Sequence, residues 1–93
     1  MHYIIAYDIT DNKKRNKLST LLDKYGIRVN YSVYECQFNK TKLKNLISKI
    51  KELNLYDKKT DSIRFYHIHK NSINNSFELS TKPQPFEALD MFV

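Results

Sequence analysis

A single carboxylate, Asp8, closes the first apolar stretch of the chain, residues 3–7, and cations follow it closely. A carboxylate at the end of a strand can bind a hard divalent cation such as Mg²⁺ or Mn²⁺, because these ions prefer oxygen ligands and keep water molecules that phosphate oxygens can replace. Four cationic residues lie within the next nine positions, namely Lys13, Lys14, Arg15 and Lys17. Side chains of this charge suit the phosphates on which such a metal acts. Taken alone, the pattern is that of an ordinary strand end and helix start, or of a site for metal-dependent phosphodiester chemistry.

The composition predicts one small domain, residues 1–93, with an anionic partner. The chain has 16 Lys and Arg against 10 Asp and Glu, a formal net charge of +6, which attracts nucleic acid at least non-specifically. Cys36 is the sole cysteine, so no internal disulfide argues for secretion. No apolar run reaches the roughly 18 residues of a membrane span, and no signal-peptide pattern is present. We therefore expect a soluble, cytoplasmic protein without a membrane partner.

Periodicity places Asp8 at the end of a strand over residues 2–9 that has apolar residues on both faces. Thr10 or Asp11 can cap the helix that follows, and Gly26 is predicted to end it in a left-handed conformation. The buried face of this helix is predicted to comprise Leu18, Leu21, Leu22 and Tyr25. Cations in its first turn oppose the helix macrodipole, so local stability does not explain them and a bound ligand would.

The rest of the chain completes an α+β pattern. Residues 27–38 read as extended with a break near Tyr31-Ser32, which predicts two strand segments. A second helix is predicted from Lys40-Thr41 to about Leu53, and a further strand over residues 62–69. The order predicts the ferredoxin-like βαββαβ arrangement, with both helices on one face of an antiparallel sheet. A second copy would cover the bare face, so we expect a homodimer.

Two motifs resemble the CRISPR-associated protein 2 family, and they occur in the same order in this short chain. Residues 7–11 read Tyr-Asp-Ile-Thr-Asp with Arg15 downstream, and residues 25–35 read Tyr-Gly-Ile-Arg-Val-Asn-Tyr-Ser-Val-Tyr-Glu. Residues 61–66 look like the family's later strand. The resemblance covers roughly residues 2–69. It implies a homodimer of CRISPR adaptation that scaffolds the integrase complex, binds double-stranded DNA, and in some members cleaves RNA or DNA with a divalent metal. The implied partner is the CRISPR integrase, the first CRISPR-associated protein.

Carried over by position, Asp8 matches the family's metal-binding aspartate, which each subunit contributes once. The resemblance implies catalytic roles for Asp8, Arg15 and Arg28, with Tyr7, Ser32 and Tyr34 near the site. Tyr34 stands where the family often has Phe, Asn30 where Gln is common, and Lys17 where Arg is common. The residues expected to bind nucleic acid are Lys13, Lys14, Arg15, Lys17 and Arg28. The apolar tail, residues 77–93, is expected to cross to the second subunit and extend its sheet as an exchanged strand.

The sequence also allows several other interpretations of the function and of individual residues. If the two Asp8 groups lie far apart, the protein is a catalytically inactive platform that grips a duplex backbone. A toxin-type endoribonuclease has a similar size and charge, whereas a plain RNA-binding module of this fold usually has a Gly/aromatic strand motif that is missing. His67 and His69 could bind a metal but lack an evident third ligand. Cys36 is expected in the core.

Overall fold

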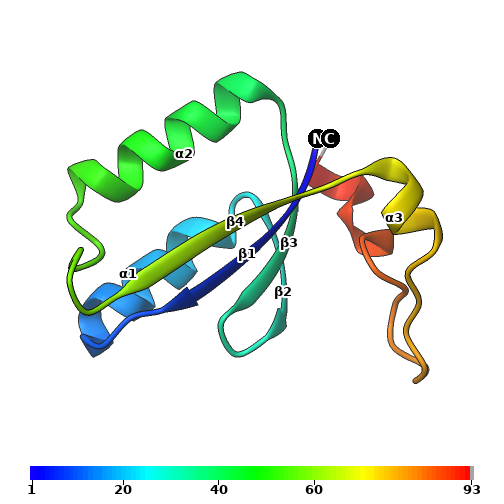
Figure 1. The fold of residues 1–93 in the computed structure, drawn as a ribbon, viewed down its shortest axis with the longest axis horizontal. Helices are drawn as coiled ribbons and strands as arrows, with labels where there is room; N and C mark the ends of the chain where they lie inside the picture. Colours follow the sequence, from blue (N-terminus) through cyan, green and yellow to red (C-terminus); the bar gives the residue numbers. More distant parts are fainter. Residues whose placement is uncertain (93) are drawn as a thin grey trace.

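The computed structural model describes residues 1–92, which form four strands, three α-helices and one 3₁₀ helix (Figure 1). In chain order these elements are β1 (His2–Asp8), α1 (Asn12–Leu22), β2 (Gly26–Asn30), β3 (Val33–Gln37), α2 (Lys40–Glu52), β4 (Ser62–Ile68), α3 (Lys70–Asn74) and the 3₁₀ helix η1 (Glu87–Phe92). The first six follow the predicted βαββαβ order. No helix in the described part of the chain is long and apolar enough to span a membrane.

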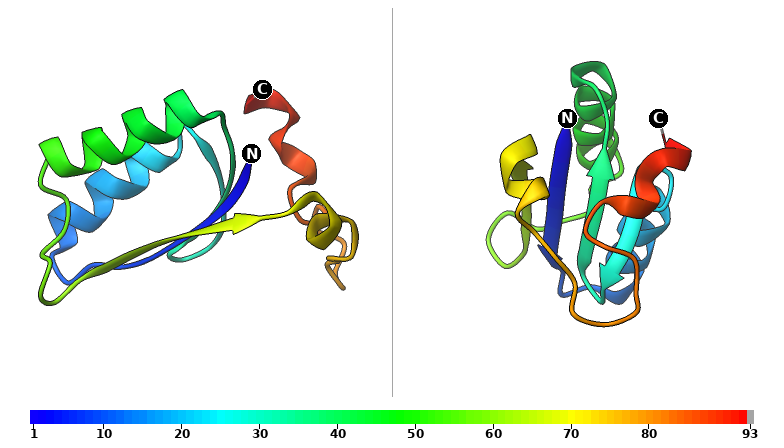
Figure 2. Two further views of the ribbon diagram at one scale, coloured as in Figure 1. Left: turned by 45° about the horizontal axis from the view of Figure 1, so that its top comes forward. Right: turned by 90° about the vertical axis from the view of Figure 1, so that its right-hand side faces the viewer.

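The four strands form one antiparallel sheet in the order β2-β3-β1-β4, so β1 lies inside the sheet and β4 at an edge. Helices α1 and α2 lie side by side on one face, as Figure 2 shows from two further directions. Because side chains alternate along a strand, Ile5 and Tyr7 point to the helices while Ile4, Ala6 and Asp8 occupy the opposite, open face. This arrangement confirms the predicted α+β, ferredoxin-like fold.

The main core lies between the helices and the sheet, where the period-2 pattern of the strands meets the helical stripes. Its buried members are Ile5, Tyr7, Ile9, Leu18, Leu21, Leu22, Tyr34, Cys36, Phe38, Leu46, Ile50 and Leu55. Asp11 caps α1 by accepting a hydrogen bond from the backbone N–H of Lys14 at 3.1 Å. Asn39 caps α2 by accepting one from the N–H of Lys42 at 2.8 Å. Both caps satisfy backbone donors that a helix start leaves unpaired.

The prediction that Gly26 ends α1 in a left-handed conformation is wrong, because Gly26 has no positive φ and begins β2. The helix ends earlier, with Asp23 as its C-cap. Glycine is needed at position 26 for close packing of β2 on β3. A Cβ atom there would lie 2.2 Å from the backbone oxygen of Glu35 and 2.6 Å from the Sγ atom of Cys36.

The end of α2 also differs from the predicted stripe, because Leu53 is 45% exposed. Leu53 is the C-cap, and Asn54 follows it with a φ of 53°. The N–H of Asn54 donates to the oxygen of Lys51, and the N–H of Leu55 donates to the oxygen of Ile50. This is a Schellman-type turn, in which a left-handed residue reverses the chain after a helix. The turn buries Leu55 in place of Leu53.

The tail folds back on its own sheet in this single chain. Phe86 and Leu89 are buried outside the main core, and the backbone N–H of Phe86 donates to the Glu35 carboxylate at 2.9 Å. Since Glu35 neighbours Tyr34 in β3, it points to the open face of the sheet. Within the described residues of the tail, 77–92, the ordered element is η1 and no strand forms. Exchange of residues 77–93 between two subunits stays a prediction, and Val93 lies outside the described residues.

Candidate metal and nucleic-acid site at the end of the first strand

Asp8 is the last residue of β1 and lies where the open face of the sheet meets the β1–α1 turn. Its neighbours Tyr7 and Ile9 point to the core and are 6% and 2% exposed, which fixes the backbone on either side of it. The side chain itself is exposed. Across the sheet Asp8 pairs with Ser62 at the start of β4. A rigid strand therefore presents this carboxylate to solvent.

Arg15 returns to the same turn from the first turns of α1. Its Nη1 atom donates to the backbone oxygen of Ile9 at 2.9 Å, and its Nη2 atom donates to the Asn12 side chain. The structure thus places a guanidinium group at the turn that directly follows Asp8. Lys13 and Lys17 are exposed on α1, Lys14 is half-buried, and the first turn of α1 has no acidic residue. The cations predicted to meet phosphate therefore lie on the helix that follows the turn.

Asp61 locks this turn to the connection before β4. One carboxylate oxygen accepts hydrogen bonds from the N–H and the hydroxyl of Thr10, at 3.0 and 2.9 Å. The other accepts one from the N–H of Asp57 at 2.8 Å. The N–H of Asp57 and then that of Thr10 hold the pKa of the Asp61 carboxyl below its usual value, because these donors favour the charged form. Asp61 is a positioning residue for the loop beside Asp8.

Arg28 does not join Asp8. A bulge between Arg28 and Asn30 sets the register of β2, which pairs Arg28 with Tyr34 of β3. Tyr34 in turn pairs with Ile5 of β1, so Arg28 shares the helix-facing side of the sheet with both. Asp8 lies on the other side. In the single chain the structure brings Arg15 to the turn after Asp8 and places Arg28 elsewhere, so a catalytic or nucleic-acid-binding role for Arg28 stays a prediction.

Arg28 instead belongs to a partly buried polar network between β2, β3 and α1, in which Ser19 and Tyr34 are buried and Arg28 is exposed. Its guanidinium lies 5.8 Å from the centre of the Tyr34 ring and donates to the Ser19 hydroxyl. The Tyr34 hydroxyl lies 2.8 Å from the Ser19 hydroxyl and donates to the Asp23 carboxylate at 2.6 Å. Burial, and then the bond to Asp23, raise the pKa of the Tyr34 phenol, so it remains a neutral donor. The Tyr34 hydroxyl is therefore hydrogen-bonded within the chain.

The remaining predicted site residues serve packing and pairing. Tyr7 is buried with its ring centre 6.3 Å from that of Tyr34, and its backbone N–H donates to the oxygen of Ser32 at 3.0 Å. These contacts hold β1 beside the β2–β3 turn and so fix Asp8 indirectly.

Cys36 is fully buried, which confirms the prediction that it is a core residue. Burial raises the pKa of its thiol to about 12.

The two histidines have structural partners. His67 stacks on Tyr3 with 5.0 Å between ring centres, and the Nδ1 atom of His69 accepts a hydrogen bond from the N–H of Asn71 at 3.2 Å. Among the side chains that the structure describes, no group of three or more from His, Cys, Asp or Glu gathers as a metal site. The histidine-based metal site is therefore not supported.

The donor set at Asp8 fits one part of a shared divalent-cation site. In the described part of the chain the Asp8 carboxylate accepts no hydrogen bond and forms no ion pair, so its oxygens are available to a hard cation. One carboxylate is too little to hold Mg²⁺ tightly. The chemistry is complete only if a second copy supplies another Asp8, with water and phosphate oxygens as the remaining ligands.

Sequence reasoning missed three residues that hold this region together: Ser19, Asp23 and Asp61. Ser19 lies between Leu18 and Leu21 on the buried face of α1, and a buried hydroxyl at such a position needs a partner. The signal was therefore present in the helical stripe. Asp61 stands before a predicted strand, but its partner Thr10 is 51 residues away in the sequence, so no local pattern reveals the contact.

Comparisons with known proteins agree with this fold. The sequence profile of the family "CRISPR associated protein Cas2" matches residues 1–76. The chain is 45% identical over 64 residues to "CRISPR-associated endoribonuclease Cas2 3" of Synechocystis sp., which covers 69% of this chain and 67% of that relative. The structure resembles Cas2 of Streptococcus pyogenes with a TM-score of 0.73 and 29% identity, covering 86% of this chain and 100% of that one. It also resembles a chain of a partial Cas6-RT-Cas1–Cas2 complex with a TM-score of 0.65 and 38% identity, covering 84% of this chain and 89% of that one.

Proposed function

The chain belongs to the CRISPR-associated protein Cas2 family, and from this premise we propose that it is a homodimeric, DNA-binding protein of CRISPR adaptation with a metal-dependent endonuclease activity. The observation that carries the proposal is the Asp8 carboxylate at the end of β1, which has no hydrogen-bond or ion-pair partner among the described residues and lies next to a turn that binds Arg15. A relative in Synechocystis is named an endoribonuclease, and a structural neighbour belongs to a Cas1–Cas2 complex. These names support a nuclease and a partnership with the Cas1 integrase.

The open face of the sheet supports pairing of two copies. Tyr66 of β4 and Val29 of β2 are 45% and 51% exposed, and Ile4 and Ile68 on the same face are only partly buried. Apolar side chains on a sheet face lower the free energy when another surface removes them from water. A second copy placed on this face would also bring its Asp8 to the same side of the sheet.

The residues of this chain have separate roles in the proposed cleavage. Asp8 from each copy would bind the metal, and the metal when bound supplies Lewis acidity toward the phosphoryl group. Arg15, held at the turn by Ile9, would stabilise negative charge that develops on the phosphate. Lys13 and Lys17 would position the backbone of the nucleic acid without reading its sequence.

Metal removal tests the proposal. We expect the purified protein to cleave labelled RNA or duplex DNA when Mg²⁺ or Mn²⁺ is present. EDTA should stop cleavage, and excess Mg²⁺ should restore it, because Asp8 alone cannot polarise a phosphate. The measurement is product formation on a denaturing gel, with each nucleic acid assayed separately.

Cleavage that continues in EDTA would contradict metal dependence. A protein that binds duplex DNA tightly at low salt, releases it at high salt and cleaves nothing would be the non-cleaving platform instead. In that case the protein would act through DNA binding by its basic surface alone.

A further inference from the structure

The positive charge of the protein is concentrated on its helical layer. Helices α1 and α2 together contain nine of the 16 Lys and Arg residues and a single acidic residue, Glu52. The rest of the chain therefore holds seven cations against nine of the 10 acidic residues. The net positive charge of +6 arises entirely from these two helices. An anionic partner would be drawn to this layer more than to the open face of the sheet.

Seven lysines line two hollows, which share no lining residue and which both lie between α1 and the end of α2. One, of about 710 Å³, lies between the start of α1, the end of α2 and residues 54–59, and its cations are Lys14, Lys51, Lys58 and Lys59. The other, of about 320 Å³, lies between the two helices and is lined by Lys17, Lys24 and Lys49. We call the two hollows together the lysine groove.

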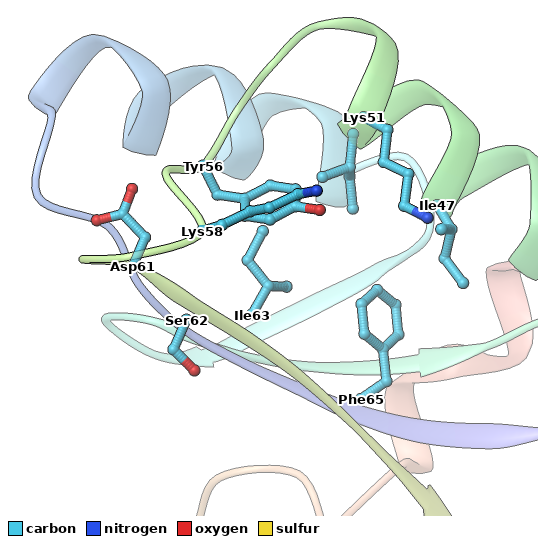
Figure 3. Close-up of a pocket in the computed structure, with 9 residues that line it drawn as sticks. Ile47, Lys51, Tyr56, Lys58, Asp61, Ser62, Ile63 and Phe65 are labelled. Carbon is cyan, nitrogen blue, oxygen red and sulfur yellow. The ribbon is translucent and has the colours of Figure 1, made fainter.

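The backbone around the lysine groove is held in place. The Schellman-type turn at Asn54 ends α2, and Asp61 ties the far end of the connection to Thr10. The Asp57 carboxylate accepts hydrogen bonds from the N–H groups of Lys59 and Thr60, at 2.7 and 3.3 Å. Lys51 of α2 and Lys58 of the connection also line a hollow with Tyr56, Ile63 and Phe65. Figure 3 shows the Lys58 side chain over the Tyr56 ring and the Lys51 side chain extending toward Ile47.

Few carboxylates neutralise these lysines. In the described part of the chain the one ion pair within 4.0 Å joins Lys49 to Glu52, at 3.9 Å, and both side chains are largely exposed. Asp57 faces backbone donors instead of an ammonium group. Several ammonium groups on an ordered surface repel one another, and this cost falls when phosphates lie between them.

We propose that the lysine groove binds the phosphate backbone of double-stranded DNA, as a contact surface additional to the turn at Asp8. Helix α2 has 13 residues and so is about 20 Å long, which matches the rise of about six base pairs of duplex. Lys14 and Lys17, which are predicted from the sequence to bind nucleic acid, also line the lysine groove. This inference rests on the proposed DNA binding and names α2 and the 54–59 connection as further parts of that interface.

The test compares two double variants with the same change in charge. Lys51→Gln/Lys58→Gln removes two cations from the lysine groove, whereas Lys70→Gln/Lys82→Gln removes two exposed cations outside it. The probe is a fluorescein-labelled 24-base-pair duplex of random sequence, with binding followed by fluorescence anisotropy at several salt concentrations. The melting temperature of each variant shows that it is folded.

We expect the groove variant to bind the duplex about tenfold more weakly. The plot of log association constant against log salt concentration should also become less steep by about two, because each lost phosphate contact removes about 0.9 from the magnitude of its slope. The control variant should keep the wild-type slope and change affinity less than about threefold. Equal changes in the two folded variants would overturn the groove while leaving DNA binding intact. A wild-type protein that does not bind the duplex at all would overturn the proposed function and the groove with it.

Discussion

Replacing Asp8 with Asn should reduce metal-dependent cleavage by about a hundredfold or more. The amide keeps the size of the side chain but removes the negative charge that would hold a divalent cation, and a loss of about 3 kcal/mol of transition-state stabilisation slows a reaction about a hundredfold. Because Asp8 is exposed and unpaired within the described residues, the variant should keep its fold. Initial rates with saturating Mg²⁺ measure the effect.

Asp11→Asn is the matched control for this change. Asp11 lies three residues further along and caps α1, and Asn is an equally good N-cap, so its fold and its cleavage rate should stay near wild type. Duplex binding should survive in both variants, since neither removes a cation. If folded, dimeric Asp8→Asn cleaves at the wild-type rate, Asp8 has no role in catalysis.

Replacing Gly26 with Ala should destabilise the protein by about 3 kcal/mol, at the upper end of the usual cost of overpacking. The new Cβ atom would lie 2.2 Å from the backbone oxygen of Glu35 and 2.9 Å from the Cα atom of Cys36. Both are backbone atoms of β3, so neither can move away as a flexible side chain could. Separation of β2 from β3 would also disturb Arg28 and its network. Urea denaturation of both proteins measures the loss.

Tyr31→Ala provides the comparison in the turn that directly follows β2. Tyr31 is 89% exposed, so its truncation should change the free energy of unfolding by less than about 0.5 kcal/mol. If Gly26→Ala unfolds at the wild-type urea midpoint, β2 and β3 are not packed as closely as the structure has them.

Patterns local in sequence predicted most of the fold. Apolar residues at strand spacing indicated β1 and β4, and the leucine stripes indicated both helices, with Thr10 or Asp11 as the expected cap of the first. The break at Tyr31-Ser32 separated β2 from β3 as predicted. Asp8 at the end of β1 could be predicted because a strand end is a local feature. These elements depend on backbone propensity and on burial of one face, which neighbouring residues encode.

The parts that sequence could not predict depend on contacts between distant residues. The role of Gly26 comes from the approach of β3, and the position of Arg28 on the helix-facing side comes from the bulge before Asn30. Burial of Leu55 instead of Leu53 follows from a left-handed Asn54, which helical periodicity does not show. The contact of Asp61 with Thr10 joins two loops that meet only after the sheet has formed.

The lysine groove also could not be predicted from the sequence. The sequence reveals that cations are abundant on both helices, but not that Lys14 and Lys51 line one hollow. Their proximity depends on the packing of α1 beside α2 on the sheet. Charge counts therefore predict the class of partner, while the fold determines which surface binds it.

The most direct measurement is the number of metal ions bound for each pair of chains, together with their position. Crystals grown with Mn²⁺ would reveal the ion by its anomalous scattering, and titration followed by electron paramagnetic resonance would count it in solution. We expect one Mn²⁺ for two chains, bound between the two Asp8 carboxylates, and none for Asp8→Asn. A dimer whose Asp8 carboxylates lie far apart and bind no Mn²⁺ would contradict a shared metal site.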